Sequence, residues 1–237
     1  MESLSVYLTA AILFLEIGGY RIYIRYLRKE ETDPNPTTWF MVAYGSMVMF
    51  ALEGFAIDAS DNFSVKTVMK YAVVLQPVLC FYFNLQIMRM MWRQGRWRAP
   101  NSMLEWIALI LDLMISVILL LKKGLDVLVE KFGLYGLIDL QFIPSTQMVF
   151  VLLVLSNLSM VLCFLPLLDS VRKDRTSERV TPWIIWLFSY FALIWLTAIE
   201  HGWHNELMIY PVLSAVLHLA VLFFIAFGRT PTTVSAT

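Results

Sequence analysis

The sequence predicts an all-α membrane protein whose seven transmembrane helices form two parallel three-helix repeats joined by a linker helix, a 3+1+3 arrangement. The first observation is composition: 59% of the residues are hydrophobic and 15% are charged, whereas soluble domains average about 25% charged residues. The second is a set of seven apolar stretches, each close to the roughly 20 residues that a helix needs to cross a bilayer. The third is a charged segment that occurs twice between such stretches. Together they favour a polytopic bundle with an internal duplication.

The apolar stretches are separated by charged or polar segments, and none alternates with the period of a barrel strand, so helices are expected throughout. The predicted spans are 4–27, 38–57, 69–91, 103–121, 146–169, 182–200 and 208–228. The longest connection is about 122–145, where Leu125, Leu128 and Val129 follow helical spacing and predict an interfacial helix. Residues 230–237 are expected to form a disordered polar tail.

The basic residues predict an orientation. Thirteen Lys and Arg residues, including every arginine, lie beside the first, third and fifth connections or after the last span, and five lysines lie on the other side. By the positive-inside rule this places the N-terminus outside and the C-terminus in the cytoplasm of an integral, multi-pass protein whose constant partner is the lipid bilayer. The net charge is zero, which argues against a nucleic-acid partner. The oligomeric state stays open, a homo-oligomer included.

The duplicated segment joins spans one and two, and again spans five and six. Residues 27–32 lead to Trp39, and residues 171–176 lead to Trp183, at a constant offset of 144. Both tryptophans fall where a span begins, which predicts interfacial anchors. A second match pairs Pro77 with Pro211 at an offset of 134, because the outer connection of the first half is ten residues longer.

These matches divide the chain. Residues 1–91 form the first three-helix repeat, 92–145 the linker helix with its outer loop, and 146–229 the second repeat, ahead of the tail at 230–237. An odd linker helix keeps both triplets in the same orientation. The pseudo-twofold axis that relates them is therefore expected to run along the membrane normal.

A 3+1+3 bundle with an outside N-terminus resembles the SWEET sugar transporters and the wider PQ-loop class. The likeness is strongest in the second half, in Leu165-Pro166-Leu167-Leu168, then Val171-Arg172-Lys173, then Thr176-Ser177, then Pro182. The sequence departs from the family in lacking a Pro-Gln pair in the first or fifth span, and Thr38 stands opposite Pro182. The resemblance implies alternating access, with a midplane pocket to which polar side chains of the third and seventh spans contribute.

Candidate substrate contacts follow from the repeat. Asn84 and His218 each lie seven residues after the matched prolines, near the middle of their spans, where a polar side chain is costly unless it meets a cavity or a partner. Gln76 and Tyr210 directly precede the same prolines, and Asn157 is a further buried polar candidate. The alternative is that these groups only bond neighbouring helices or lie at interfaces.

Glu16 lies deep in the first span, where an ionised carboxylate is expensive, and is a candidate for proton coupling. It could instead pair with Arg21 or Arg25 on the same helix. Pro77, Pro166 and Pro211 are hinge candidates, because a proline inside a helix frees a backbone carbonyl and permits bending.

Three other classes of function can be compared with transport. His201 and His204, three residues apart and flanked by acids, could hold a metal ion in an intramembrane hydrolase, although a polar outer loop explains them more simply. A non-transporting receptor or assembly protein is a further alternative, but a retinal protein is disfavoured because no lysine lies in span 208–228. No catalytic set, metal site or cofactor is expected. The sequence favours transport of a small polar solute, such as a sugar or an amino acid, over an enzymatic role.

Overall fold

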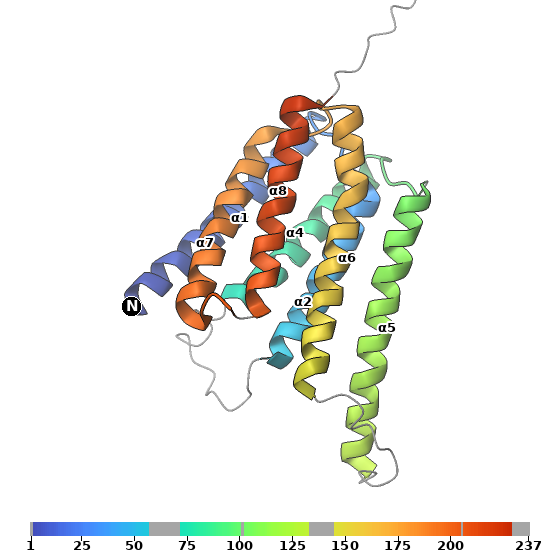
Figure 1. Ribbon diagram of the computed structural model, residues 1–237. Coiled ribbons are helices and arrows are strands. Elements are labelled where there is room, and N and C mark those ends of the chain that lie inside the picture. Colours follow the sequence, from blue (N-terminus) through green and yellow to red (C-terminus); the bar gives the residue numbers. More distant parts are fainter. Residues whose placement is uncertain (1, 57–71, 101, 133–144, 205, 229–237) are drawn as a thin grey trace, which may run out of the picture.

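The computed structural model describes residues 2–56, 72–100, 102–132, 145–204 and 206–228, and these residues form helices joined by short loops. The elements are α1 (Glu2–Arg28), α2 (Pro36–Ala56), α4 (Ala72–Arg93), α5 (Met103–Phe132), α6 (Ser145–Lys173), α7 (Val180–His201), a short 3-10 turn (Glu206–Met208) and α8 (Ile209–Phe227). Each predicted span overlaps one of the seven α-helices (Figure 1). The predicted tail at 230–237 lies outside the described residues.

The connection after the fourth span differs from the prediction. Residues 122–132 continue α5 as one helix of 30 residues and do not form a separate interfacial helix. The helical spacing of Leu125, Leu128 and Val129 therefore predicts the helix correctly, but the prediction of a separate interfacial helix is wrong. Gly124 did not end the helix, because one glycine in a helix costs only about 1 kcal/mol relative to alanine.

Two side-chain caps explain where α2 and α5 begin. The Asn35 side-chain oxygen accepts hydrogen bonds from the backbone N–H groups of Thr37 and Thr38, at 3.0 and 3.3 Å. Ser102 and Glu105 form a reciprocal capping box, with each side chain accepting from the backbone N–H of the other. The Asn35 amide also donates to Glu105 at 2.7 Å, which ties the start of α2 to the start of α5.

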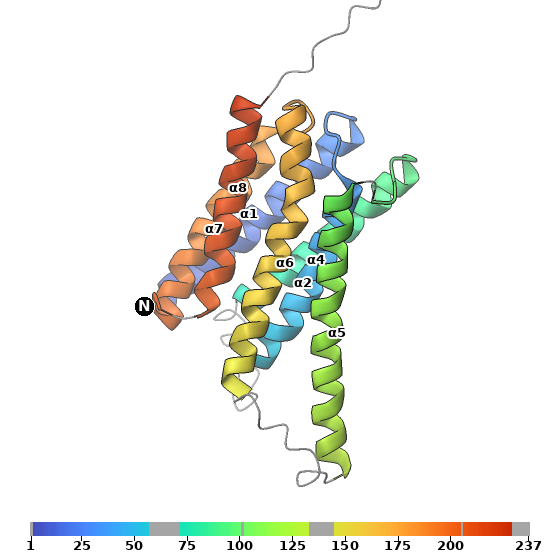
Figure 2. The same cartoon turned by 45° about the vertical axis from the view of Figure 1, so that its right-hand side comes forward.

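Six of the helices form a closed ring, in the order α1, α4, α2, α6, α8, α7 and back to α1. Within the first half α4 packs between α1 and α2, and within the second half α8 packs between α6 and α7. The halves meet twice, where α1 packs on α7 and where α2 packs on α6. Helix α5 stands outside the ring against α6 and α2 (Figures 1 and 2).

The outward faces of the ring helices carry large apolar side chains. Exposed examples are Phe14 on α1, Phe188 and Trp195 on α7, and Val216 and Phe223 on α8. Contiguous exposed apolar surface is rare on soluble monomers. Among the described helices, α1, α7 and α8 each hold a stretch long and apolar enough to cross a membrane.

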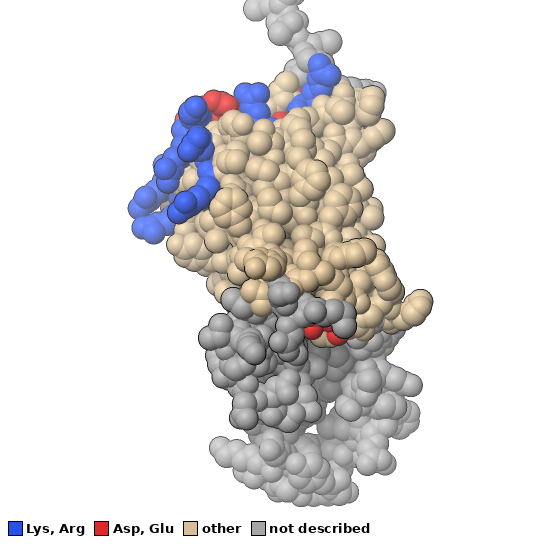
Figure 3. All heavy atoms as spheres, turned by 90° about the vertical axis from the view of Figure 1, so that its left-hand side faces the viewer, with Lys and Arg blue, Asp and Glu red and all other residues tan. Residues whose placement is uncertain are grey.

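Lys and Arg gather at one end of the molecule, which is the upper end in Figure 3. This basic end consists of three connecting segments, 29–35, 94–100 and 174–179, and the adjoining helix termini. At the opposite end, the Ser5 hydroxyl donates to the Glu200 carboxylate and joins α1 to α7.

Candidate functional site

A cavity of about 50 Å³ lies at the centre of the six-helix ring. A buried water needs roughly 10–15 Å³ measured in the same way, so the cavity has room for a few small atoms or waters. Every ring helix contributes to its wall and α5 does not. The lining residues are Glu16, Tyr20, Thr38, Trp39, Met41, Val42, Gly45, Ser46, Cys80, Met160, Cys163, Phe164, Leu167, Trp183, Trp186, Tyr190, Tyr210, Ser214 and His218.

Many of the lining residues stand at matching positions of the two halves. Residues are paired at an offset of 144 in the first two helices of each half and at an offset of 134 in the third helix. In several of these pairs, both residues line the cavity. These pairs are Glu16 with Met160, Tyr20 with Phe164, Trp39 with Trp183, Val42 with Trp186, Ser46 with Tyr190, and Cys80 with Ser214. A cavity lined in this way is expected to lie on an axis that relates the two halves.

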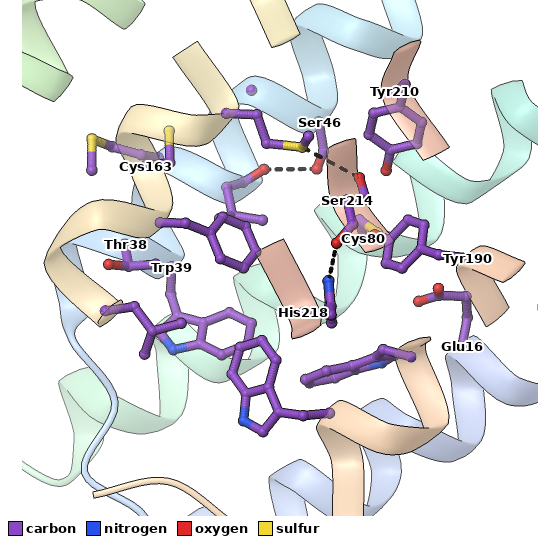
Figure 4. A pocket seen from close by; sticks show the side chains of 18 of the residues that line it. Glu16, Thr38, Trp39, Ser46, Cys80, Cys163, Tyr190, Tyr210, Ser214 and His218 are labelled. Carbon is purple, nitrogen blue, oxygen red and sulfur yellow. Dashed lines mark hydrogen bonds between the residues drawn. The ribbon is translucent and has the colours of Figure 1, made fainter. Parts of the chain in front are cut away.

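His218 is held inside an aromatic cluster. Its Nδ1 lies 2.7 Å from the Ser214 carbonyl one turn earlier on α8, so Nδ1 carries the proton and Nε2 can accept a hydrogen bond (Figure 4). Four rings surround the imidazole at centroid distances between 4.8 and 6.0 Å: Phe164, Trp183, Trp186 and Tyr190. This packing fixes the ring in one orientation at the cavity wall.

Glu16 presents the only carboxylate among the lining residues, and Figure 4 shows it pointing inward beside Tyr190. The Gln76 amide donates to Glu16 Oε1 at 2.9 Å from behind the wall, on α4. Within the described residues Glu16 forms no ion pair, and Arg21 and Arg25 are exposed. The proposed pairing along α1 is therefore absent from this structure.

The remaining polar candidates divide between the cavity and the helix interfaces. Tyr210 lines the cavity with His218. Asn84 and Asn157 are buried outside the lining, and neither polar atom of the Asn84 side chain has a hydrogen-bond partner among the described residues. The offset of 134 makes Asn84 and His218 equivalent positions, but of these two only His218 lines the cavity in this arrangement of the helices.

The three prolines also differ. Pro77 and Pro166 lie inside α4 and α6, where each removes a helical hydrogen bond. Pro211 lies in the first turn of α8, where a proline interrupts no preceding turn of the same helix. Bending is therefore expected within α4 and α6.

Trp39 and Trp183 are not the interfacial anchors that their position at the start of a span predicts. Both side chains are buried, at 4% and 1% exposure, in the wall of the cavity nearest the basic end. Tyr23 packs on Trp39 with centroids 4.8 Å apart and on Trp186 at 5.7 Å. The two copies of the duplicated segment contact each other at the basic end, and this contact excludes water from both tryptophans.

A buried carboxylate, Glu178, supports this aromatic cluster from the basic end. It accepts a hydrogen bond from the Tyr23 hydroxyl at 2.9 Å and from Trp183 Nε1 at 3.2 Å. Burial raises the pKa of Glu178 to about 8, against the two hydrogen bonds, which favour the ionised form. Sequence reasoning missed this residue because Glu178 sits in a charged loop, where an acid is usually solvated.

The two copies of the duplicated segment meet at the basic end. The backbone N–H of Asp33 donates to the Ser177 carbonyl at 2.8 Å. Arg179 Nε donates to the Glu31 carbonyl at 3.1 Å, and its guanidinium lies 3.7 Å from the Glu31 carboxylate. Arg96, from the third segment, bonds Asp33 at 2.6 Å. The Asp33–Ser177 and Arg179–Glu31 contacts hold the two halves together at the basic end.

The two histidines considered for a hydrolase, His201 and His204, are not part of a complete metal site among the described residues. His201 is half-buried at the end of α7 and His204 is exposed. In the part of the chain that the structure describes, no three His, Cys, Asp or Glu side chains are grouped so that they could hold a metal ion. Nothing in this geometry favours the hydrolase over the transporter.

Comparison of the chain with family models, curated proteins and solved structures found no match.

Proposed function

We propose that the chain is a membrane transporter that carries a small polar solute by alternating access through the central cavity. The observation that carries the proposal is that all six ring helices contribute to one buried cavity with polar groups, and that they do so at matching positions of the two halves. A bundle whose only role was structural would be expected to fill this space with apolar side chains.

The proposal includes seven membrane crossings in a 3+1+3 arrangement. Its support is the ring order, in which the third helix of each half packs between the first two, and the symmetric pairing of α1 with α7 and α2 with α6. Helix α5, outside the ring, is the linker. The basic end is proposed to face the cytoplasm, because arginine and lysine concentrate there. The resemblance to SWEET and PQ-loop transporters agrees with this arrangement.

The contacts at the basic end act as a gate in this mechanism. For the solute to leave on that side, the Asp33–Ser177 and Arg179–Glu31 contacts must separate and the Tyr23, Trp39 and Trp183 rings must part. Bending at Pro77 and Pro166 would permit the two triplets to rock against each other. Glu16, in the cavity wall, is the proposed site of proton coupling.

Transport is tested with the purified full-length chain in liposomes and a panel of labelled small solutes. We expect uptake above protein-free liposomes for at least one solute, and lower uptake for His218→Ala and for Asn84→Ala. Trp195→Phe, on the exposed face of α7, is the matched control and should retain wild-type uptake. Wild-type uptake by the double variant His218→Ala/Asn84→Ala would remove both residues from the transport pathway.

A further inference from the structure

The wall of the central cavity is unusual in its aromatic content and its charge. Seven of the nineteen lining residues are Tyr, Trp or Phe, whereas aromatic residues make up 14% of the chain. The lining contains one carboxylate, Glu16, and no lysine or arginine. An anionic solute, or the anionic part of a zwitterion, would therefore meet no lysine or arginine in the wall, where His218 is the one basic side chain.

Among the residues that the structure describes, the Glu16 carboxylate has no charged partner. Its Oε1 accepts from Gln76, and Ser189 is the other polar side chain that approaches it, so only neutral groups surround it. An ionised carboxylate in a low-dielectric interior is strongly unfavourable unless a cation or a proton compensates it. A cationic solute in the cavity would supply that compensation when it binds.

Aromatic rings extend the site beyond the carboxylate. Tyr20 follows Glu16 by one helical turn and packs on Trp186, with centroids 4.9 Å apart. Tyr190 lies beside Glu16 and is 6.1 Å from Tyr210. The faces of such rings attract organic cations, most strongly where water is excluded. A neutral sugar could bond the polar groups of this wall, but it would leave the Glu16 carboxylate without a compensating charge.

We propose that the solute is a small organic cation, an alkylammonium without an anionic group, which Glu16 and the aromatic rings of the central cavity bind together. The proposal rests on the transport function and specifies its substrate class. The volume of about 50 Å³ suits a compact cation of few heavy atoms, so a cation as large as choline, with seven, binds only if side chains of the wall move outward. Trp39 and Trp186 also line the cavity, and their indole N–H groups have no partner among the described residues, so a hydroxyl on the solute would find donors there.

The test compares choline with 3,3-dimethylbutan-1-ol, a neutral alcohol of the same shape in which carbon replaces the charged nitrogen. Binding to the purified full-length chain in detergent is followed by titration calorimetry and by tryptophan fluorescence, because three tryptophans line the cavity. We expect choline to bind at least tenfold more tightly than the alcohol. Equal affinities, or no binding of choline at millimolar concentration to folded protein, would overturn the proposal.

Two variants assign the charge recognition to a residue. Glu16→Gln should weaken choline binding at least tenfold and leave the alcohol unchanged, whereas Asp112→Asn, a buried acid of α5 outside the cavity, should leave both unchanged. Unchanged choline affinity in a folded Glu16→Gln variant would contradict the assignment. If that variant does not fold, Tyr20→Leu takes its place, with the same selective loss expected and retained affinity counting against the site.

The outcomes separate this inference from the transport function. Binding of choline without its uptake into liposomes would overturn transport and leave the cation site intact. Uptake of a neutral solute by protein that does not bind choline would overturn the cation site and leave transport intact.

Discussion

The backbone N–H of Asp33 donates to the carbonyl of Ser177 at 2.8 Å, and these two residues occupy the same position in the two copies of the duplicated segment. Residues that are equivalent under a twofold rotation can touch each other only close to the axis of that rotation. In the proposed two-repeat arrangement, the pseudo-twofold axis would pass close to this contact at the basic end. The central cavity, lined by matched pairs, would lie on the same axis deeper in the bundle.

A disulfide across this contact is expected to stop transport. In Asp33→Cys/Ser177→Cys, oxidation should crosslink the two halves and abolish uptake, and a reductant should restore it, because the halves must separate at this end. Native Cys80 and Cys163 are buried and should not react. Each single cysteine variant serves as a control. Full uptake by protein shown by mass spectrometry to be crosslinked would contradict gating at this end.

Stability is expected to depend on pH through Glu178. Its pKa is about 8 in the folded chain and 4.5 in an exposed reference, so between these values the folded state holds a proton that the unfolded state has lost. Stability therefore falls as pH rises through this window, by up to about 1.4 kcal/mol per pH unit, and levels off above the folded pKa.

The measurement is the thermal unfolding midpoint of the detergent-solubilised protein between pH 5 and pH 9. Glu178→Gln should reduce the slope because no proton is then taken up at this site. Glu30→Gln, at an exposed position of the same basic end, should keep the wild-type slope. A wild-type slope in Glu178→Gln would assign the dependence to another group.

Adjacent glycines in α1 offer a matched test of the packing between α1 and α7. A Cβ on Gly19 would lie 2.5 Å from Trp186 Nε1, whereas a Cβ on Gly18 would meet nothing within 4 Å. We expect Gly19→Ala to displace Trp186 from the cavity wall and to reduce uptake. The free energy of unfolding should fall by about 1–3 kcal/mol, which is typical of overpacking, and the unfolding midpoint should fall with it.

Gly18→Ala should be neutral or slightly stabilising, because alanine is the better helix former by about 1 kcal/mol. The same melting and uptake assays compare the two variants. Equal behaviour would show that α1 does not need the close approach at Gly19.

The bond between Gln76 and Glu16 is expected to orient the carboxylate. Gln76→Leu keeps a similar volume but removes the donor that holds Glu16 Oε1. Choline affinity and solute uptake should both fall, while the protein stays monodisperse. Gln94→Leu, at the end of α4 near the basic end, provides the comparison and should retain choline affinity. Retained choline affinity in Gln76→Leu together with lost affinity in Gln94→Leu would show that Gln76 does not position the Glu16 carboxylate.

The helices could be predicted from the sequence because the length of an apolar stretch can be seen in the local sequence alone. The convergence of side chains could not, because a nearly uniform apolar span such as 182–200 does not indicate which face is inward. The structure, not the pattern, shows that Trp186 and Tyr190 face His218. The internal offset did contain a usable signal, since it pairs Trp39 with Trp183 and Tyr20 with Phe164, all of which line the cavity.

Two errors have a common physical cause. Trp39 and Trp183 were assigned to the interface, and Glu178 was not singled out, because all three lie at or next to a charged loop. The loop copies fold against each other and exclude water from these side chains, and the Trp183–Glu178 hydrogen bond forms in the space that results. Tertiary contact between distant segments, which no local pattern contains, decides their burial.

Transport through the central cavity is tested most directly by time-dependent uptake of labelled solutes into liposomes containing the full-length chain, measured before and after the Asp33→Cys/Ser177→Cys pair is oxidised. Uptake of at least one small solute above protein-free liposomes, lost on oxidation and recovered on reduction, is the predicted result. No uptake of any solute by folded protein, or uptake that persists in the crosslinked chain, would contradict alternating access through this cavity.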